Sequence, residues 1–170
     1  MKSNFNEVEE LLNKKIESFS DDVIFNYQKS YLNKVLKRNK LRLLTILNLV
    51  DCYNLNIKSL YLKYVSVYIK KDEFFIHIDL VQKEEYKVFF LDKNHELFFQ
   101  KNFKIEEIDE VFNLDLNKIY KDYLNRKLIE KECNIIKENI EFYLKSLNPT
   151  QKNLELLNII EKIMEENQND

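Results

Sequence analysis

Residues 62–100 have the sequence LKYVSVYIKKDEFFIHIDLVQKEEYKVFFLDKNHELFFQ, which is the most informative part of the chain for its architecture. The stretch is rich in Tyr, Val, Ile and Phe, which strands favour, and charged clusters interrupt it at 70–73, 82–85 and 92–95. We interpret these clusters as four-residue loops that join four strands. The stretch therefore predicts a four-stranded antiparallel β-meander over about 62–100.

The chain contains no glycine, and its sequence shows no alanine. Glycine lets a backbone curl around a phosphate or expose a nucleophile on a strained turn. Its absence excludes a Walker-type loop, a dinucleotide-binding fingerprint and a nucleophile elbow. It also disfavours two-residue hairpin turns, which prefer positive φ, and favours longer loops in which Asn94 takes the left-handed conformation.

Helices are expected on both sides of the meander. Apolar residues recur at helical spacing over about 6–19 and 23–53, and again from 106 to the end of the chain. Within the long segment before Pro149 the apolar stripe changes sides near 130–132, which indicates either a break or two halves with different partners. The predicted fold is α+β, with N-terminal helices, the central meander and C-terminal helices packed on the sheet. We expect a single compact domain over residues 1–170.

Alternation along the strands assigns the residues of the meander to two faces. One face is aliphatic and aromatic, and we expect helices to cover it. The other face mixes tyrosines with a histidine and an aspartate, and an aromatic surface of this kind is typical of a binding site where it stays exposed. The sequence leaves open whether the C-terminal helices cover this face or a partner uses it. The candidate partner-binding residues are Tyr64, Tyr68, Phe75, His77, Asp79 and Tyr86.

His77 and Asp79 are the one pair that resembles catalytic machinery. They point the same way from one strand, with Ser66 expected opposite His77, so the histidine is either a carboxylate-oriented base or a hydrogen-bonded neighbour in a polar patch. The chain has two histidines and no metal-ligand spacing. We interpret Cys52 and Cys133 as reduced, mostly buried thiols. The sequence predicts no catalytic residue, no metal and no cofactor, and hence a protein that is not an enzyme.

The densest positive feature is a basic stripe, defined as Lys34, Lys37, Arg38, Lys40 and Arg42. Such a stripe either contacts phosphates or an acidic protein surface, or is a solvated helix face. The net charge of −2 provides no general attraction to nucleic acid, so any such binding depends on this local patch.

The function expected from these patterns is stoichiometric binding to another macromolecule, with a protein as the partner. Residues with GC-rich codons are scarce and are replaced by Lys, Asn, Ile, Phe, Tyr and Leu. This composition indicates an AT-rich genome, which fits a phage-encoded anti-defence inhibitor or an immunity or antitoxin protein. The alternative is a nucleic-acid-binding regulator that uses the basic stripe at 34–42. We expect a cytoplasmic protein with no signal peptide and no membrane span. A homodimer formed through the amphipathic last helix is left open.

Overall fold

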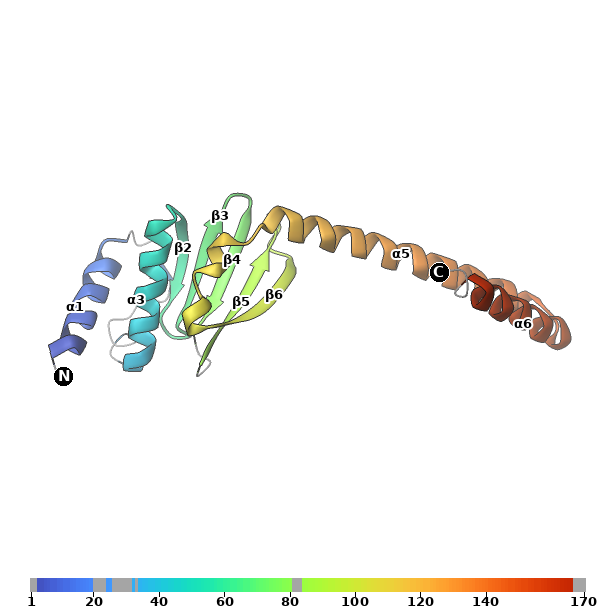
Figure 1. Cartoon of the computed structure of the whole chain (residues 1–170), viewed down its shortest axis with the longest axis horizontal. Helices are drawn as coiled ribbons and strands as arrows, with labels where there is room; N and C mark the ends of the chain where they lie inside the picture. Colours follow the sequence, from blue (N-terminus) through green and yellow to red (C-terminus); the bar gives the residue numbers. More distant parts are fainter. Residues whose placement is uncertain (1–2, 20–23, 26–31, 33, 81–83, 167–170) are drawn as a thin grey trace. The chain divides into compact units, whose positions relative to one another are not determined.

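The computed structural model describes residues 3–19, 24–25, 32, 34–80 and 84–166. The chain divides into two compact units, Met1–Lys121 and Asp122–Asp170. The first unit combines a β-sheet with helices (Figure 1), which confirms the α+β class. Its elements are α1 (Ser3–Glu17), β1 (Ile24–Phe25), α3 (Lys37–Cys52), β2 (Asn56–Tyr61), β3 (Ser66–Lys71), β4 (Phe74–Asp79), β5 (Glu85–Leu91), β6 (Leu97–Lys104), η1 (Ile105–Glu107), α4 (Glu110–Asn113) and the start of α5 (Leu116–Ser146).

The sheet places its six strands in chain order. Strands β2 to β6 form an antiparallel meander, and the two-residue β1 pairs with β2 in parallel. The meander therefore has one strand more than the sequence predicted. The missed strand is β2, in which a register shift between Ile57 and Ser59 interrupts the two-residue period that reveals a strand. The helix expected over about 23–53, for which the sequence also allows a break near Asn39, is interrupted. Residues 24–25 are a strand, residues 32 and 34 are helical, Val35 and Leu36 are not, and α3 begins at Lys37.

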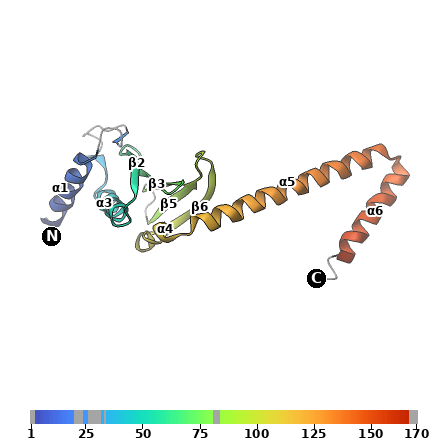
Figure 2. The ribbon, with the colours of Figure 1, turned by 90° about the horizontal axis from the view of Figure 1, so that it is seen from above.

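The core of the first unit lies between the sheet and helices α3, α4 and the first turns of α5, and Figure 2 shows α3 and α4 on one side of the strands. Leu43, Ile46 and Leu47 of α3 are fully buried. On the sheet, the Phe74 ring packs edge-on against Tyr120 of α5. Burial of a large apolar side chain contributes about 1.5–3 kcal/mol. The C-terminal helices expected on the sheet are thus represented by α4 and the first turns of α5, while α1 packs on α3.

The chain replaces glycine with other residues where the backbone turns left-handed. Asn54 (φ 52°) follows the end of α3, and the amides of Asn54 and Leu55 donate to the carbonyls of Asp51 and Val50 at 3.0 and 2.9 Å. This hydrogen-bond pattern ends a helix and normally has glycine at the left-handed position. Val65 (φ 48°) is the strained case, because a β-branched side chain is rarely found in this region.

Two hairpins of the meander contain the other described residues with positive φ. Asp72 (φ 54°) and Glu73 form a two-residue turn between the paired Lys71 and Phe74, so the predicted four-residue loop at 70–73 is wrong. In the turn after β5 the left-handed residue is His95 (φ 63°) and not Asn94. The absence of glycine therefore does not lengthen the loop between β3 and β4. Asp72 takes the left-handed conformation that glycine would otherwise adopt in this two-residue turn.

The second unit contains the rest of α5 and α6 (Pro149–Glu166). The helix α5 continues without a break through 130–132. The interpretation that the helix breaks where its apolar stripe changes sides is therefore wrong. Asn148 caps α6: its Oδ1 accepts the Gln151 amide at 3.0 Å, and the Gln151 side chain accepts the Asn148 amide at 3.4 Å. Pro149 occupies the first position of α6, where its missing N–H costs no hydrogen bond. The chain reverses direction between α5 and α6 (Figure 2).

Candidate binding surface

The side of the sheet that points away from α3 and α4 is called the open face here. Its residues alternate with the buried core positions, and in strands β4 and β5 each of them is half-buried. The strand register aligns these residues into three rows across the sheet. The first row is Tyr61, Ser66, Asp79, Lys87 and Asn102; the second is Ser59, Tyr68, His77, Phe89 and Gln100; the third is Lys70, Phe75, Leu91 and Leu97.

Five rings gather at the centre of the open face and are called the ring cluster: Tyr68, Phe75, His77, Phe89 and His95. His95 stacks on Phe75 with centroids 4.3 Å apart, and Tyr68 stacks on Phe75 at 5.5 Å. His77 stacks on Phe89 at 5.5 Å and lies 6.0 Å from Tyr68. Both histidines of the chain are therefore part of one aromatic surface.

Asp92 builds the turn that brings His95 to the ring cluster. This buried carboxylate accepts the amides of Asn94 and Glu96 at 2.8 and 3.0 Å through Oδ1. The Tyr120 hydroxyl of α5 donates to its Oδ2 at 3.1 Å. Burial and the hydrogen bond to Asp92 raise the pKa of Tyr120 above 10.0, so this hydroxyl keeps its proton. The turn is consequently fixed before any partner binds.

His77 lies among aromatic rings, with the Asp79 carboxylate nearby. Burial lowers its pKa below the usual 6.5, and the nearby Asp79 charge opposes this effect without reversing it. Tyr68 and Phe89 are its cross-strand neighbours, whereas Ser66 lies opposite Asp79 and not opposite His77 as expected. An imidazole that stacks on Phe89 and lies beside the tilted Tyr68 ring is suited to contact with a partner.

The structure brings together four of the six residues predicted to bind a partner. Tyr68, Phe75, His77 and Asp79 share the open face. Tyr64 is 58% exposed but lies in the turn before β3. Tyr86 is fully buried on the opposite side of the sheet, where the Arg42 guanidinium lies 4.2 Å from its ring centroid.

The face of β5 was predicted wrongly because the register between β4 and β5 differs by one residue from the expected one. Asp79 pairs with Lys87, whereas a loop at 82–85 would pair Asp79 with Val88. A shift of one residue moves every side chain of the strand to the other face. This shift placed Tyr86 on the open face and left out Lys87, Phe89 and Leu91. Lys87, between Tyr86 and Val88, was the signal that could have corrected the assignment of faces, because a lysine in an otherwise apolar strand belongs on the solvent side.

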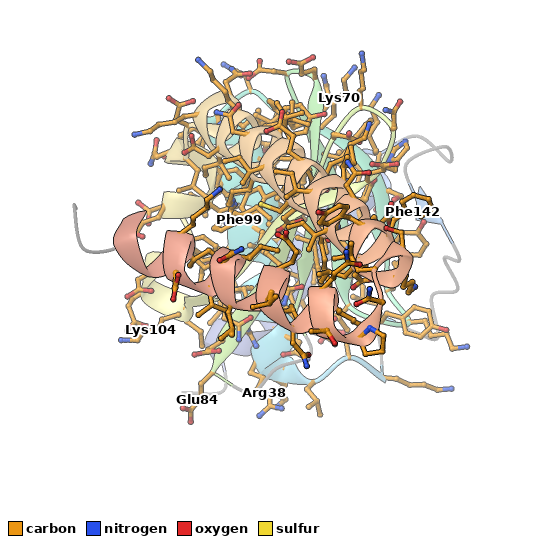
Figure 3. All side chains as sticks on the ribbon, turned by 90° about the vertical axis from the view of Figure 1, so that its right-hand side faces the viewer. Arg38, Lys70, Glu84, Phe99, Lys104 and Phe142 are labelled. Atoms are coloured by element: carbon orange, nitrogen blue, oxygen red, sulfur yellow. The ribbon has the colours of Figure 1, made fainter. Side chains whose placement is uncertain are left out.

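The basic stripe is not a single exposed surface. Lys34, Lys37 and Arg38 are exposed, and the Arg38 side chain extends outward (Figure 3). Lys40 is buried and its Nζ lies 3.0 Å from Glu9 of α1. Arg42 is 4% exposed and donates to the carbonyl oxygens of Leu80, at 3.1 Å, and Glu85. Lys40 and Arg42 are thus buried, although both were predicted to contact nucleic acid. Each has polar partners for its charged group, so its aliphatic carbons can be buried without leaving the charge unpaired.

No group of three His, Cys, Asp or Glu side chains among the described residues could hold a metal ion. Cys52 and Cys133 are exposed, so the expectation of mostly buried thiols is wrong. No helix in the described part of the chain is long and apolar enough to cross a membrane.

Comparisons with known proteins do not assign this chain to a protein family. No family model, no curated protein and no solved structure matches it.

Proposed function

We propose that the protein is a non-enzymatic binding protein whose open face associates stoichiometrically with another protein. The ring cluster is the observation that carries this proposal. Aromatic residues are enriched at the centres of protein interfaces, where they bury a large area at a low cost in side-chain entropy. Four of the five rings project from paired strands, and the fifth from a turn held by Asp92.

The rigidity of the cluster supports a recognition role. Tyr68, Phe75 and His77 come from two central strands that pair along their full length. A surface that already has its bound arrangement loses little freedom on association, so more of the contact energy appears as affinity. Loops with long flexible side chains would lack this advantage.

The charges on the open face favour a protein over a nucleic acid as the partner. Asp79 lies opposite Lys87. Glu85 lies opposite Lys104, and its Oε2 accepts a hydrogen bond from the side-chain Nδ2 of Asn102 at 2.9 Å. Acidic and basic groups therefore alternate around the rings, whereas surfaces that bind phosphate backbones are consistently basic. Balanced charges of this kind orient a protein partner.

Within this class, the narrower proposal is an inhibitor, such as a phage-encoded anti-defence protein or an immunity or antitoxin protein. The amino-acid composition, which indicates an AT-rich genome, supports it. An inhibitor of this type blocks its target by occupying a surface, so it needs affinity and shape but no reacting group. We further propose that it acts in the cytoplasm.

The test compares two sets of variants of the full chain in binding to host lysate treated with nuclease. Tyr68→Ser combined with Phe89→Ser removes two central rings and should abolish retention of a partner. Lys37→Glu combined with Arg38→Glu changes the exposed basic residues and should leave retention unchanged. Unfolding by denaturant shows that each variant is folded.

An oligo-dT probe and an oligo-U probe provide the opposing arm. The proposal predicts no binding that depends steeply on salt. Tight binding of either probe, lost in the Tyr68→Ser variant or in the Arg38→Glu variant, would instead assign the protein to the nucleic-acid-binding class.

A further inference from the structure

The second unit exposes an unusual amount of apolar surface. In its described part Leu144 is the one buried side chain, at 9% exposure. The half-exposed or more exposed apolar side chains of this unit are Leu124, Leu128, Ile129, Ile135, Ile136, Phe142, Tyr143, Leu154, Leu157, Ile160 and Ile163. Monomeric proteins seldom leave contiguous apolar patches of this size in water, so we expect a partner to cover it.

On α5 part of this surface forms a regular stripe. Leu128, Ile135 and Phe142 follow one another at intervals of seven residues, so they lie on one side of the helix. Phe142 is the most exposed at 78%, and Figure 3 labels this ring on α5. Leu144 and Leu147 lie on a different side of the same helix, and they are its more buried residues near the turn to α6.

A matching stripe runs along α6. Leu154, Leu157 and Ile160 are spaced by three residues and are each exposed by half or more, while Ile159 on another side is less exposed. Each helix of the hairpin therefore has two apolar sides. One contains the less exposed residues, Leu144 and Leu147 on α5 and Ile159 on α6, and the other contains the exposed stripe. A helix with two apolar sides is typical of a bundle with more than two members.

The area fits a second copy of the same hairpin. At roughly 100 Å² for each half-exposed large side chain, the apolar residues of the unit expose on the order of 1,000 Å². A stable interface buries about 800 Å² on each partner. The two stripes together with their neighbours therefore expose enough apolar area for a stable interface. A second copy related by a two-fold axis provides its own α5 and α6 to cover them.

The charges beside the α5 stripe are complementary to themselves. Lys131 and Glu138 flank Ile135, four residues before it and three after it. When two α5 helices align antiparallel with Ile135 near the two-fold axis, Lys131 of each copy lies opposite Glu138 of the other. Because symmetry repeats the pair, this alignment gains two opposite-charge contacts.

We propose that the second unit dimerises the protein, with the Leu128, Ile135 and Phe142 stripe and the Leu154, Leu157 and Ile160 stripe buried in a four-helix bundle of two copies. This inference is independent of the role proposed for the open face. The two can fail separately, because the residues that carry them belong to different units.

The test measures the mass of the full chain by sedimentation equilibrium over a range of concentrations. At micromolar concentration the wild type should have twice the monomer mass of 20.8 kDa, and dilution should return it reversibly to the monomer. Ile135→Glu combined with Phe142→Glu should make it monomeric at every concentration. Leu157→Glu, which changes α6 alone, should weaken the dimer at least tenfold.

Asn125→Glu combined with Asn134→Glu is the matched control, since it adds the same charge to exposed positions of α5 outside the stripe. The control should remain dimeric. A wild type that is monomeric with its helices intact by circular dichroism would overturn the proposal and assign the stripes to a different protein. A dimer that survives the Ile135→Glu and Phe142→Glu changes would overturn the placement of the interface.

Discussion

The Tyr68 hydroxyl lies 2.6 Å from Nδ1 of His95 and joins the central strand β3 to the turn between β5 and β6. Burial, followed by the neighbouring Tyr61, raises the pKa of Tyr68 above 10.0, so the hydroxyl remains protonated at neutral pH. The bond spans 27 residues of sequence and fixes the edge of the ring cluster.

Tyr68→Phe removes this hydrogen bond and keeps the stacked ring. We expect a loss of at most about 1 kcal/mol of folding free energy, because the bond is exposed to water on one side. Denaturant unfolding measures the loss. Partner binding should weaken moderately, and Tyr64→Phe, in the turn before β3, should change neither quantity.

Asp92→Ala removes the acceptor that holds the turn around His95. It leaves the amides of Asn94 and Glu96 and the Tyr120 hydroxyl without their carboxylate, so we expect a loss of about 2–4 kcal/mol. Asp92→Asn retains one acceptor oxygen and should lose less. Lys93→Ala in the same exposed turn is the control, and an equal loss in that variant would contradict the role of the carboxylate.

His77 makes folding stability depend on pH. Its folded pKa lies below the unfolded value near 6.5 because burial disfavours the charged ring. The unfolded chain therefore takes up a proton first, and stability falls as the pH drops from 6.5 toward the folded pKa. His77→Phe preserves stacking on Phe89 and should remove this part of the pH dependence in unfolding measured from pH 7 to pH 5. An unchanged slope would show that other groups cause it.

Asp72→Gly should stabilise the protein by roughly 0.5–1 kcal/mol, because glycine has no Cβ to clash at a positive φ. Thermal unfolding measures the gain. The same change at Lys70, in strand β3 next to the turn, should destabilise by a similar amount. A loss in both variants would indicate that the Asp72 side chain supports the turn.

Charge exchange tests the antiparallel alignment of two α5 helices. Lys131→Glu alone and Glu138→Lys alone each create like-charge contacts at both symmetric positions, so each should weaken the dimer by a few-fold up to tenfold. The two changes together should restore the wild-type dissociation constant. Additive weakening in the double variant would exclude the alignment.

The sequence predicted the fold class because long apolar runs with a period of two are difficult to mistake. It predicted the faces of β3 and β4 because Val67, Ile69, Ile76 and Ile78 alternate with polar residues. It failed at β5, where one residue in a connection reverses the faces, and local sequence does not determine that length. It also counted Lys40 and Arg42 as exposed, because their partners Glu9, Leu80 and Glu85 are distant in sequence and only the fold brings them together.

Asp92 holds two parts of the first unit with one side chain. One oxygen binds the amides of the turn that presents His95, and the other binds Tyr120, which belongs to the opening turns of α5. The first turns of α5 and the shape of the turn are therefore linked through one carboxylate. A change at Tyr120 alters the carboxylate that also shapes the edge of the ring cluster.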